Sequence, residues 1–197
     1  MKYQKGIKIL DVSFNQLSEI PRNTFPKLYE LCSINFSHNN LTKIYRSVFA
    51  PLFSIRHINF SHNHIEELES STMGKVPTIL TLDFSYNRLK KIKRGAFGGL
   101  VSLRTIFLVS HTLNLCFNIS QDHNDLKEIP TPTISLNHMY LGHNNISNTR
   151  RGRVPWPVMN SLISLHLDSN SFQDNLAEPG RFSGLNVLQV GGEEQSG

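Results

Sequence analysis

Hydrophobic side chains recur along this chain with a spacing of 24 residues. The stretch Leu31–Leu41 (LCSINFSHNNL) fits the pattern L-x-x-L-x-L-x-x-N-x-L at every fixed position, with isoleucine and phenylalanine in two leucine positions. The pattern recurs at Ile7–Leu17 upstream, and at Ile55–Ile65 and Ile79–Leu89 downstream. Four copies in one register predict a solenoid, in which each unit packs only against its neighbours.

Each unit divides into a strand-forming half and a loop-forming half. The x-L-x-L-x segment alternates apolar and polar residues and is rich in β-formers, which predicts a short strand. The second half carries I-x-x-x-x-F-x-x-L, as in Ile20, Phe25 and Leu28. Because these loops are wider than the strands, the stack should curve. The predicted fold class is α/β, a solenoid with a curved parallel β-sheet on its concave face and loops and short helical turns on its convex face.

An asparagine occupies the ninth position of the unit. A buried amide is stable only when it is hydrogen-bonded, and its two donors and one acceptor suit backbone groups that a turn leaves unpaired. We therefore predict a structural ladder, without a catalytic role, made of Asn15, Asn39, Asn63, Asn87, Asn124, Asn144 and Asn170.

The units predict a single array over residues 1–197, with starts near residues 7, 31, 55, 79, 103, 136 and 162 and a partial unit near 188. Terminal units of a solenoid normally carry a polar or disulfide-bonded cap. Neither end of this chain has that pattern. We expect the array to be an interior piece of a longer one, whose open ends would favour aggregation or partial unfolding in isolation.

The fifth unit is interrupted by residues 109–121 (VSHTLNLCFNISQ), which fit no position of the repeat. Removing these 13 residues joins LRTIFL to DHNDLKEIP and brings Asn124 into the asparagine ladder. One interpretation is a functional loop extruded from the turn. The other, which we favour, is a retained intron, since valine codons begin with GT, a glutamine codon can end in AG, and the frame is kept. Sequencing the mature transcript across this junction distinguishes the two.

Charge and composition exclude several classes of function. The formal net charge is +5, and basic residues gather at 90–94 and 150–153. Both runs follow an asparagine turn, so we interpret them as solvated loops rather than contacts for polyanions or acidic lipids. No aromatic residues alternate with them, which argues against nucleic acid. No apolar run approaches the roughly 20 residues of a membrane-spanning helix, and we recognise no signal peptide.

The sequence offers little for catalysis or metal binding. It has no G-x-S-x-G, no phosphate-binding glycine loop and no H-E-x-x-H. Its two cysteines have no zinc spacing. We predict no enzymatic activity, no cofactor and no metal. Four of the nine histidines directly precede a ladder asparagine, which indicates packing beside the turn or, alternatively, a pH-sensitive contact; they are His38, His62, His123 and His143.

The outward positions of the predicted strands form a polar, weakly charged surface on the concave face. Such a surface suits a protein or a glycan better than a small molecule. Aromatic side chains carry a disproportionate share of contact energy, so the anchors should lie where they gather. The binding candidates are Phe107, His138, Tyr140 and His166, together with His57 and Asp83.

Sequons of the type N-x-S/T are a second functional feature. On exposed turns they would carry glycans, which favours a secreted protein. Asn40 and Asn145 fall on predicted turns, whereas glycans on two of the strand sites would obstruct the concave face. The candidates are Asn35, Asn40, Asn59, Asn118 and Asn145.

The segments LDVSFNQLSEIPRNTF, INFSHNNLTKIYRSVF, LDFSYNRLKKIKRGAFGGL and RRGRVPWPVMNSLISL resemble the phenylalanine-bearing leucine-rich repeats of extracellular animal proteins, over about residues 7–190. They are most similar to the chaoptin-like adhesion proteins of insect photoreceptors, and also similar to Toll-like receptor ectodomains. The resemblance implies a lipid-anchored array on the cell surface that mediates adhesion, with a like molecule or another surface protein as partner. The alternative is the ligand-binding ectodomain of a Toll-like signalling receptor, and a weaker one is an intracellular scaffold.

Overall fold

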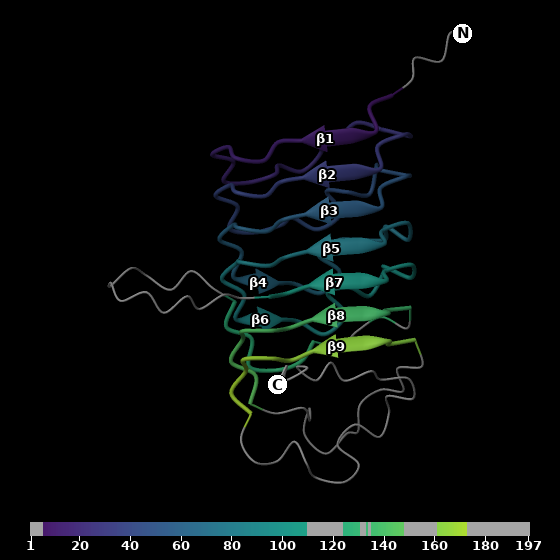
Figure 1. Cartoon of the computed structure of the whole chain (residues 1–197). Helices are drawn as coiled ribbons and strands as arrows, with labels where there is room; N and C mark the ends of the chain where they lie inside the picture. Colours follow the sequence, from purple (N-terminus) through teal and green to yellow (C-terminus); the bar gives the residue numbers. More distant parts are fainter. Residues whose placement is uncertain (1–5, 110–123, 131–132, 134, 148–160, 173–197) are drawn as a thin grey trace, which may run out of the picture.

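The structure is a computed structural model that describes residues 6–109, 124–130, 133, 135–147 and 161–172. Figure 1 shows turns of chain stacked in sequence order, with the main strands aligned on one face. The predicted parallel sheet is confirmed: seven strands pair in the order β1-β2-β3-β5-β7-β8-β9, each parallel to the next. They are β1 (Ile9–Asp11), β2 (Ser33–Asn35), β3 (His57–Asn59), β5 (Thr81–Asp83), β7 (Thr105–Phe107), β8 (His138–Tyr140) and β9 (Ser164–His166).

The register of this sheet follows the sequence repeat. Residues at the same position of successive units are direct partners, so Ile34 of β2 lies between Leu10 and Ile58. The middle residue of each three-residue strand points into the solenoid, and in β2 to β8 it is buried. The two flanking residues point outward, because side chains alternate along a strand.

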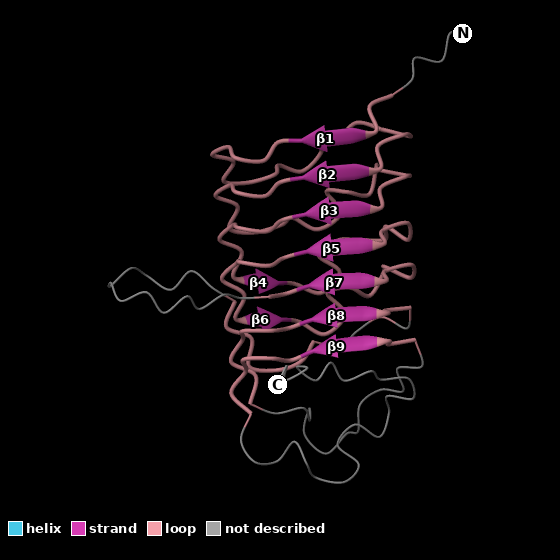
Figure 2. Ribbon diagram, viewed as in Figure 1, coloured by secondary structure: helices cyan, strands magenta, loops and turns pink. Residues whose placement is uncertain are grey.

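A second, two-stranded parallel sheet lies beside the first and was not expected from the sequence. It pairs β4 (Glu67–Leu68) with β6 (Lys91–Ile92). Figure 2 shows these two strands together with loops and no helix. Single turns take the place of the helical turns that we expected. The Ala50 N–H, for example, donates to the Ser47 carbonyl at 3.1 Å, and no described residue is helical.

The interior consists of columns of like side chains. The rings of Phe36, Phe60 and Phe84 stack along the solenoid, with centroids 5.4 and 5.0 Å apart. Phe49, from the loop side, packs edge-on against Phe60 at 5.8 Å. Burying one such side chain contributes roughly 1.5–3 kcal/mol, with a further ~1 kcal/mol for a well-oriented aromatic pair.

The asparagines join neighbouring units through their side chains. In the third unit the Asn63 Oδ1 accepts from the Leu41 N–H at 2.9 Å, and its Nδ2 donates to the carbonyls of Phe36, Phe60 and Ser61 at 2.9, 3.0 and 3.2 Å. Asn63 is 2% exposed. One side-chain amide thus forms hydrogen bonds with buried backbone groups of its own unit and of the preceding unit. Without these partners the buried polar groups would destabilise the fold.

The ladder continues across the interruption in the fifth unit. The Asn124 Oδ1 accepts from the Leu89 N–H at 2.9 Å, and its Nδ2 donates to the Phe84 carbonyl at 3.0 Å. The Tyr86 N–H donates to the Val109 carbonyl at 2.9 Å, and the corresponding N–H of the preceding unit donates to the Ser85 carbonyl in the same way. Val109 therefore holds a repeat position, and we propose that the 13 additional residues are 110–122, one residue later than the sequence pattern suggests; these residues lie outside the described part.

Candidate binding surface

The outward residues of the seven main strands form one face of the solenoid, the face predicted to be concave, which we call the floor. Its first column contains the first residue of each strand, and its second column contains the third. The first column is Ile9, Ser33, His57, Thr81, Thr105, His138 and Ser164, and the second is Asp11, Asn35, Asn59, Asp83, Phe107, Tyr140 and His166.

The second column ends in three stacked rings, which we call the aromatic half of the floor. Phe107 and Tyr140 have ring centroids 4.7 Å apart with an interplanar angle of 13°, and Tyr140 and His166 are 4.5 Å apart at 15°. In the first column the His138 Nδ1 lies 2.8 Å from the Ser164 hydroxyl. All of these side chains are half-buried, so they keep a face or an edge available to a partner.

The same column begins with four amides and carboxylates, which we call the polar half. Each accepts a hydrogen bond from the backbone N–H two residues later. For Asn35, Asn59 and Asp83 the donors are serine N–H groups at 3.0, 2.8 and 2.8 Å. At Asp11 the hydrogen bonds from Ser13, its side chain first and then its backbone, lower the pKa of the carboxyl. These side chains therefore close the turn at the end of their own strand.

The structure brings some of the predicted binding residues together and separates another. Asp83 is the direct register partner of Phe107, so it lies where the polar half meets the aromatic half. His57 lies in the first column on β3, and Thr81 and Thr105 separate it from His138. Phe107, His138, Tyr140 and His166 are neighbours on three adjacent strands, whereas His57 belongs to a different part of the floor.

A second row of stacked rings follows the end of the strands, and sequence reasoning missed it. Phe14, His38, His62 and Tyr86 occupy the eighth position of four successive units, with ring centroids 4.1, 4.1 and 4.2 Å apart. We call this row the ring column. All four residues have φ between 53° and 55°, a left-handed conformation that is costly for residues other than glycine. The repeated histidines were noticed in the sequence, but the aromatic residues at the same position were not.

Within the ring column the pKa of His62 is lowered. Burial is the largest cause, and the neighbouring His38 adds to it, while the charge of Asp83 acts in the opposite direction. Farther along the same edge, the His143 Nε2 lies 3.7 Å from a carboxylate oxygen of Asp168. His38, His62 and His143 thus lie beside the turn, and the neighbouring His38 affects the titration of His62. His123 lies outside the described residues.

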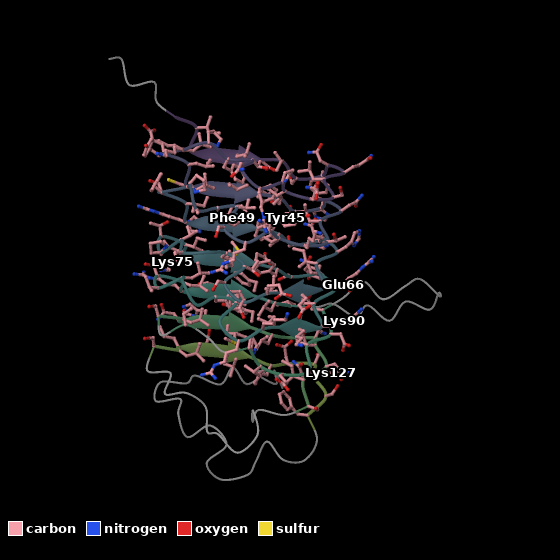
Figure 3. The ribbon with its side chains drawn as sticks, turned by 180° about the vertical axis from the view of Figure 1, so that it is seen from behind. Tyr45, Phe49, Glu66, Lys75, Lys90 and Lys127 are labelled. Atoms are coloured by element: carbon pink, nitrogen blue, oxygen red, sulfur yellow. The ribbon has the colours of Figure 1, made fainter. Side chains whose placement is uncertain are left out.

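The basic run 90–94 faces glutamates of the preceding unit. Lys93 lies 2.7 Å from Glu69 and 3.5 Å from Glu67, and Lys90 lies 3.8 Å from Glu66. The hydrogen bond to Glu69 is the main reason why the pKa of Lys93 is raised. Figure 3 shows Glu66 and Lys90 on the same side of the solenoid. These pairings support the interpretation of a solvated loop surface; the second basic run, 150–153, lies outside the described residues.

The described sequons differ in their surroundings. Asn40 and Asn145 are exposed on turns, and the Asn145 Oδ1 accepts from the Ser171 hydroxyl at 2.7 Å. Asn35 and Asn59 are half-buried in the floor, and each uses its Oδ1 to close a turn. Asn118 lies outside the described residues. Glycans on the two exposed asparagines would leave the floor clear, whereas glycans on the other two would cover its polar half.

The described residues contain no group of three or more histidine, cysteine or acidic side chains arranged to hold a metal ion. Cys32 is a free cysteine. Among the same residues, no helix is long and apolar enough to cross a membrane.

Comparisons with known proteins agree with this geometry. A family model described as leucine rich repeat matches residues 5–65 and 54–113, together more than half of the chain. A search among curated proteins gives no match. Human 5T4 (Wnt-activated inhibitory factor 1, trophoblast glycoprotein) is similar in structure, with a TM-score of 0.56 and 20% sequence identity, covering 93% of this chain and 75% of that one.

Two further solved structures are similar. A chain of the octameric complex of latrophilin 3, Unc5D and FLRT2 (LRR) has a TM-score of 0.71 and 19% identity, covering 96% of this chain and 54% of that one. A chain of the TLR13–ssRNA13 complex has a TM-score of 0.45 and 20% identity, covering 93% and 32%. This chain thus spans about half the length of the chain from the latrophilin 3 complex and about a third of the length of the chain from the TLR13 complex. At these identities the likeness shows the fold alone.

Proposed function

Because the chain belongs to the leucine-rich-repeat family, whose domains typically bind proteins and are generally non-catalytic, we propose that it is a protein-binding module of a cell-surface adhesion protein of the chaoptin-like kind. The floor is the contact surface in this proposal, and the aromatic half is its energetic centre. The partner is a like molecule or another surface protein. No catalytic step and no cofactor are part of this function.

The stack of Phe107, Tyr140 and His166 is the observation that carries the proposal. The polar half has an internal task, because its side chains close the strand ends. The Phe107 side chain has no hydrogen-bond acceptor, so it cannot close its strand end in this way. The exposed parts of the three rings remain available to a partner. Aromatic side chains with restricted motion are the usual anchors of protein interfaces, and truncating one such anchor costs ~2 kcal/mol or more of binding free energy.

The size and shape of the floor also support a protein partner. Seven strands at a spacing of about 4.8 Å extend for roughly 30 Å, comparable to one side of a standard protein interface. The surface is a regular sheet face rather than an enclosed pocket. Of the structural neighbours, FLRT2 is part of a complex with latrophilin 3 and Unc5D, which is consistent with a leucine-rich-repeat array that binds proteins.

An extracellular location is part of the proposal, and the sequons support it. Asn40 and Asn145 are exposed at the same position of their units, the tenth, beside the edge of the floor. N-linked glycans there would solubilise one flank without covering the aromatic half. Mass spectrometry of protein secreted from animal cells should find these two asparagines glycosylated; full occupancy of Asn35 and Asn59 would instead move the contact surface away from the polar half.

Cell aggregation tests the proposal. The chain, with residues 110–122 removed, is displayed on cells that do not otherwise adhere, beside a matched display of the Phe107→Ser/Tyr140→Ser variant and of a Lys91→Ser control on β6. Homophilic adhesion predicts clumps of wild-type and control cells, and none of the double variant. Clumping with added cells that lack the chain would identify a heterophilic partner. A folded, surface-exposed chain without either kind of clumping would contradict adhesion and favour the alternative, a Toll-like receptor ectodomain with a separate ligand.

A further inference from the structure

An exposed apolar row follows the flank of the solenoid that leads into the strands. It occupies the twenty-third position of four successive units and consists of Tyr29, Phe53, Pro77 and Val101. Tyr29 is 64% exposed, Phe53 52% and Val101 57%. The rings of Tyr29 and Phe53 stack at 5.3 Å with an interplanar angle of 11°. We call this row the rim.

The repeat fixes the rim in place without burying it. The residue before each rim position points inward: Leu52, Val76 and Leu100 are buried, and Leu28 pairs with Leu52 as parallel bridge partners. The carbonyl of Tyr29 accepts from the Ser54 hydroxyl at 2.6 Å. The side chains of the rim therefore form a single row with a fixed spacing. The buried residues behind the row hold it in place, but the rim side chains themselves are not part of the core.

Basic side chains flank the rim on both sides. The segments 26–33, 50–57, 74–81 and 98–105, with Lys8, contain five lysines and arginines and one carboxylate, Glu30. The five cations are exposed, and none makes an ion pair with a described residue; they are Lys8, Lys27, Arg56, Lys75 and Arg104. Figure 3 shows Lys75 on the flank opposite Glu66 and Lys90.

The two flanks thus differ in charge pairing. On the β4–β6 flank, Lys90 and Lys93 face glutamates at 3.8 and 2.7 Å. On the rim, the cations have no intramolecular partner in the described structure, and they border a file of exposed apolar side chains. An acidic partner with apolar side chains would match both features.

We propose that the rim binds an acidic amphipathic helix of another protein, laid along the stack of units. The 5.3 Å between the rings of Tyr29 and Phe53 matches the helical pitch of 5.4 Å per turn, so one apolar side chain per turn meets one unit. Four units correspond to about three turns, or roughly 11 residues. Carboxylates on either side of the apolar stripe reach Lys27 and Lys75 on one side and Arg56 and Arg104 on the other.

Charge and shape exclude the rim of a second copy as the occupant, because it would bring the same unpaired cations together. A membrane surface is broad, whereas the rim is one residue wide, and an extended strand repeats its same-face side chains about every 7 Å, which does not match one unit. The proposal does not depend on the floor. The rim lies on the flank that leads into the strands and the floor on their outward face, so adhesion through the floor can fail while rim binding holds, and the reverse.

Selection from a phage-displayed library of helical peptides tests this assignment, with the full chain as bait at low ionic strength. The proposal predicts enrichment of peptides that carry an excess of aspartate and glutamate and apolar residues at i, i+3 or i+4, and i+7. Their affinity is then measured by fluorescence anisotropy. Tyr29→Ser/Phe53→Ser and Arg56→Ser/Arg104→Ser should each weaken binding about tenfold or more, and salt should weaken the wild-type complex.

A matched control is Phe14→Ser/Lys91→Ser, which removes one exposed ring and one exposed cation away from the rim. It should leave affinity within about twofold of wild type, and thermal unfolding of all variants verifies the fold. Failure to enrich acidic helical peptides, or enriched peptides that ignore the rim variants, would overturn the proposal. Rim-dependent sedimentation with vesicles of equimolar phosphatidylcholine and phosphatidylserine, without acidic helical peptides among those selected, would also overturn it and assign the rim to a membrane surface.

Discussion

The first four units and the later units use the same interior to support different surfaces. Asn63 and Asn124 both bridge neighbouring units, although one lies in an uninterrupted stretch and the other follows the break. On the floor above them, Asn59 closes its own strand end, whereas Tyr140 stacks between two rings. The interior is dictated by the repeat, and the outward positions are where the chain can acquire a function.

The largest expected effect is on the interior of both regions. Asn63→Ala and Asn124→Ala each leave one buried N–H of the preceding unit without a partner and remove one of two donors from a carbonyl of that unit. The orphaned N–H costs about 1–3 kcal/mol and the lost hydrogen bonds to carbonyls add ~1 kcal/mol, so each variant should lose ~3 kcal/mol of the free energy of unfolding. Urea denaturation followed by circular dichroism measures the loss.

Asn15→Ala is the matched control for these ladder variants. Asn15 is exposed and donates only to the carbonyls of Val12 and Ser13 in its own unit. Its replacement should cost ~1 kcal/mol or less. Equal losses for Asn15 and Asn63 would show that the contacts between units are not what stabilises the ladder.

A smaller effect, on binding rather than stability, should separate the two halves of the floor. Tyr140→Ser removes the central ring of the aromatic stack and should weaken partner binding by ~2 kcal/mol, about 30-fold. Because Tyr140 is only half-buried, the midpoint of unfolding should change little. Titration of displayed cells with soluble partner measures the affinity, and a variant that binds normally would remove the aromatic half from the interface.

Asn59→Ala should show the reverse behaviour. The Asn59 Oδ1 accepts from the Ser61 N–H at 2.8 Å, and losing this bond should cost ~1 kcal/mol of unfolding free energy with unchanged partner binding. Chemical denaturation and the same binding titration give the two values. If binding fell as much as it does for Tyr140→Ser, both halves of the floor would belong to the interface.

The smallest expected effect is a pH dependence in the ring column. Since the pKa of His62 is lowered in the folded chain by burial and by His38, the unfolded chain binds more protons below the usual histidine pKa of about 6.5. Stability should therefore fall as the pH drops below that value. His62→Phe preserves the stack and should lessen the fall in melting temperature between about pH 7.5 and about pH 5.5. Calorimetry at these two pH values measures the difference. An identical pH profile in the variant would exclude His62 as a source.

The repeat made most of the interior predictable from sequence, because one position determines the next 24 residues away. Strand register, the buried middle residues of the strands and the asparagine positions all follow from that period. The period also located Asn124, since removing the extra residues restores the pattern. The β4–β6 sheet was missed because each strand has two residues, too few for a periodic signal, and the Glu66–Lys90 ion pair next to it is visible only when units are aligned.

Surface features were harder to predict, because they run across the units rather than along the chain. Phe14 and Tyr86 share a position with two histidines, but a search by residue type selects only the histidines. The stacking of Phe107 on Tyr140 depends on how the chain returns to the sheet after the interruption. Comparing one position over successive units would have found both the ring column and the rim.

The claim that the aromatic half of the floor is the contact surface is tested most directly by site-specific photocrosslinking. A benzophenone amino acid replaces His166 at the end of the stack, Ser33 in the opposite part of the floor, or Arg46 on the loop side, in chains displayed on adhering cells. The account predicts a crosslinked protein partner from position 166, much less from 33 and none from 46. Equal crosslinking from 46, or none from 166 while the cells still adhere, would contradict it.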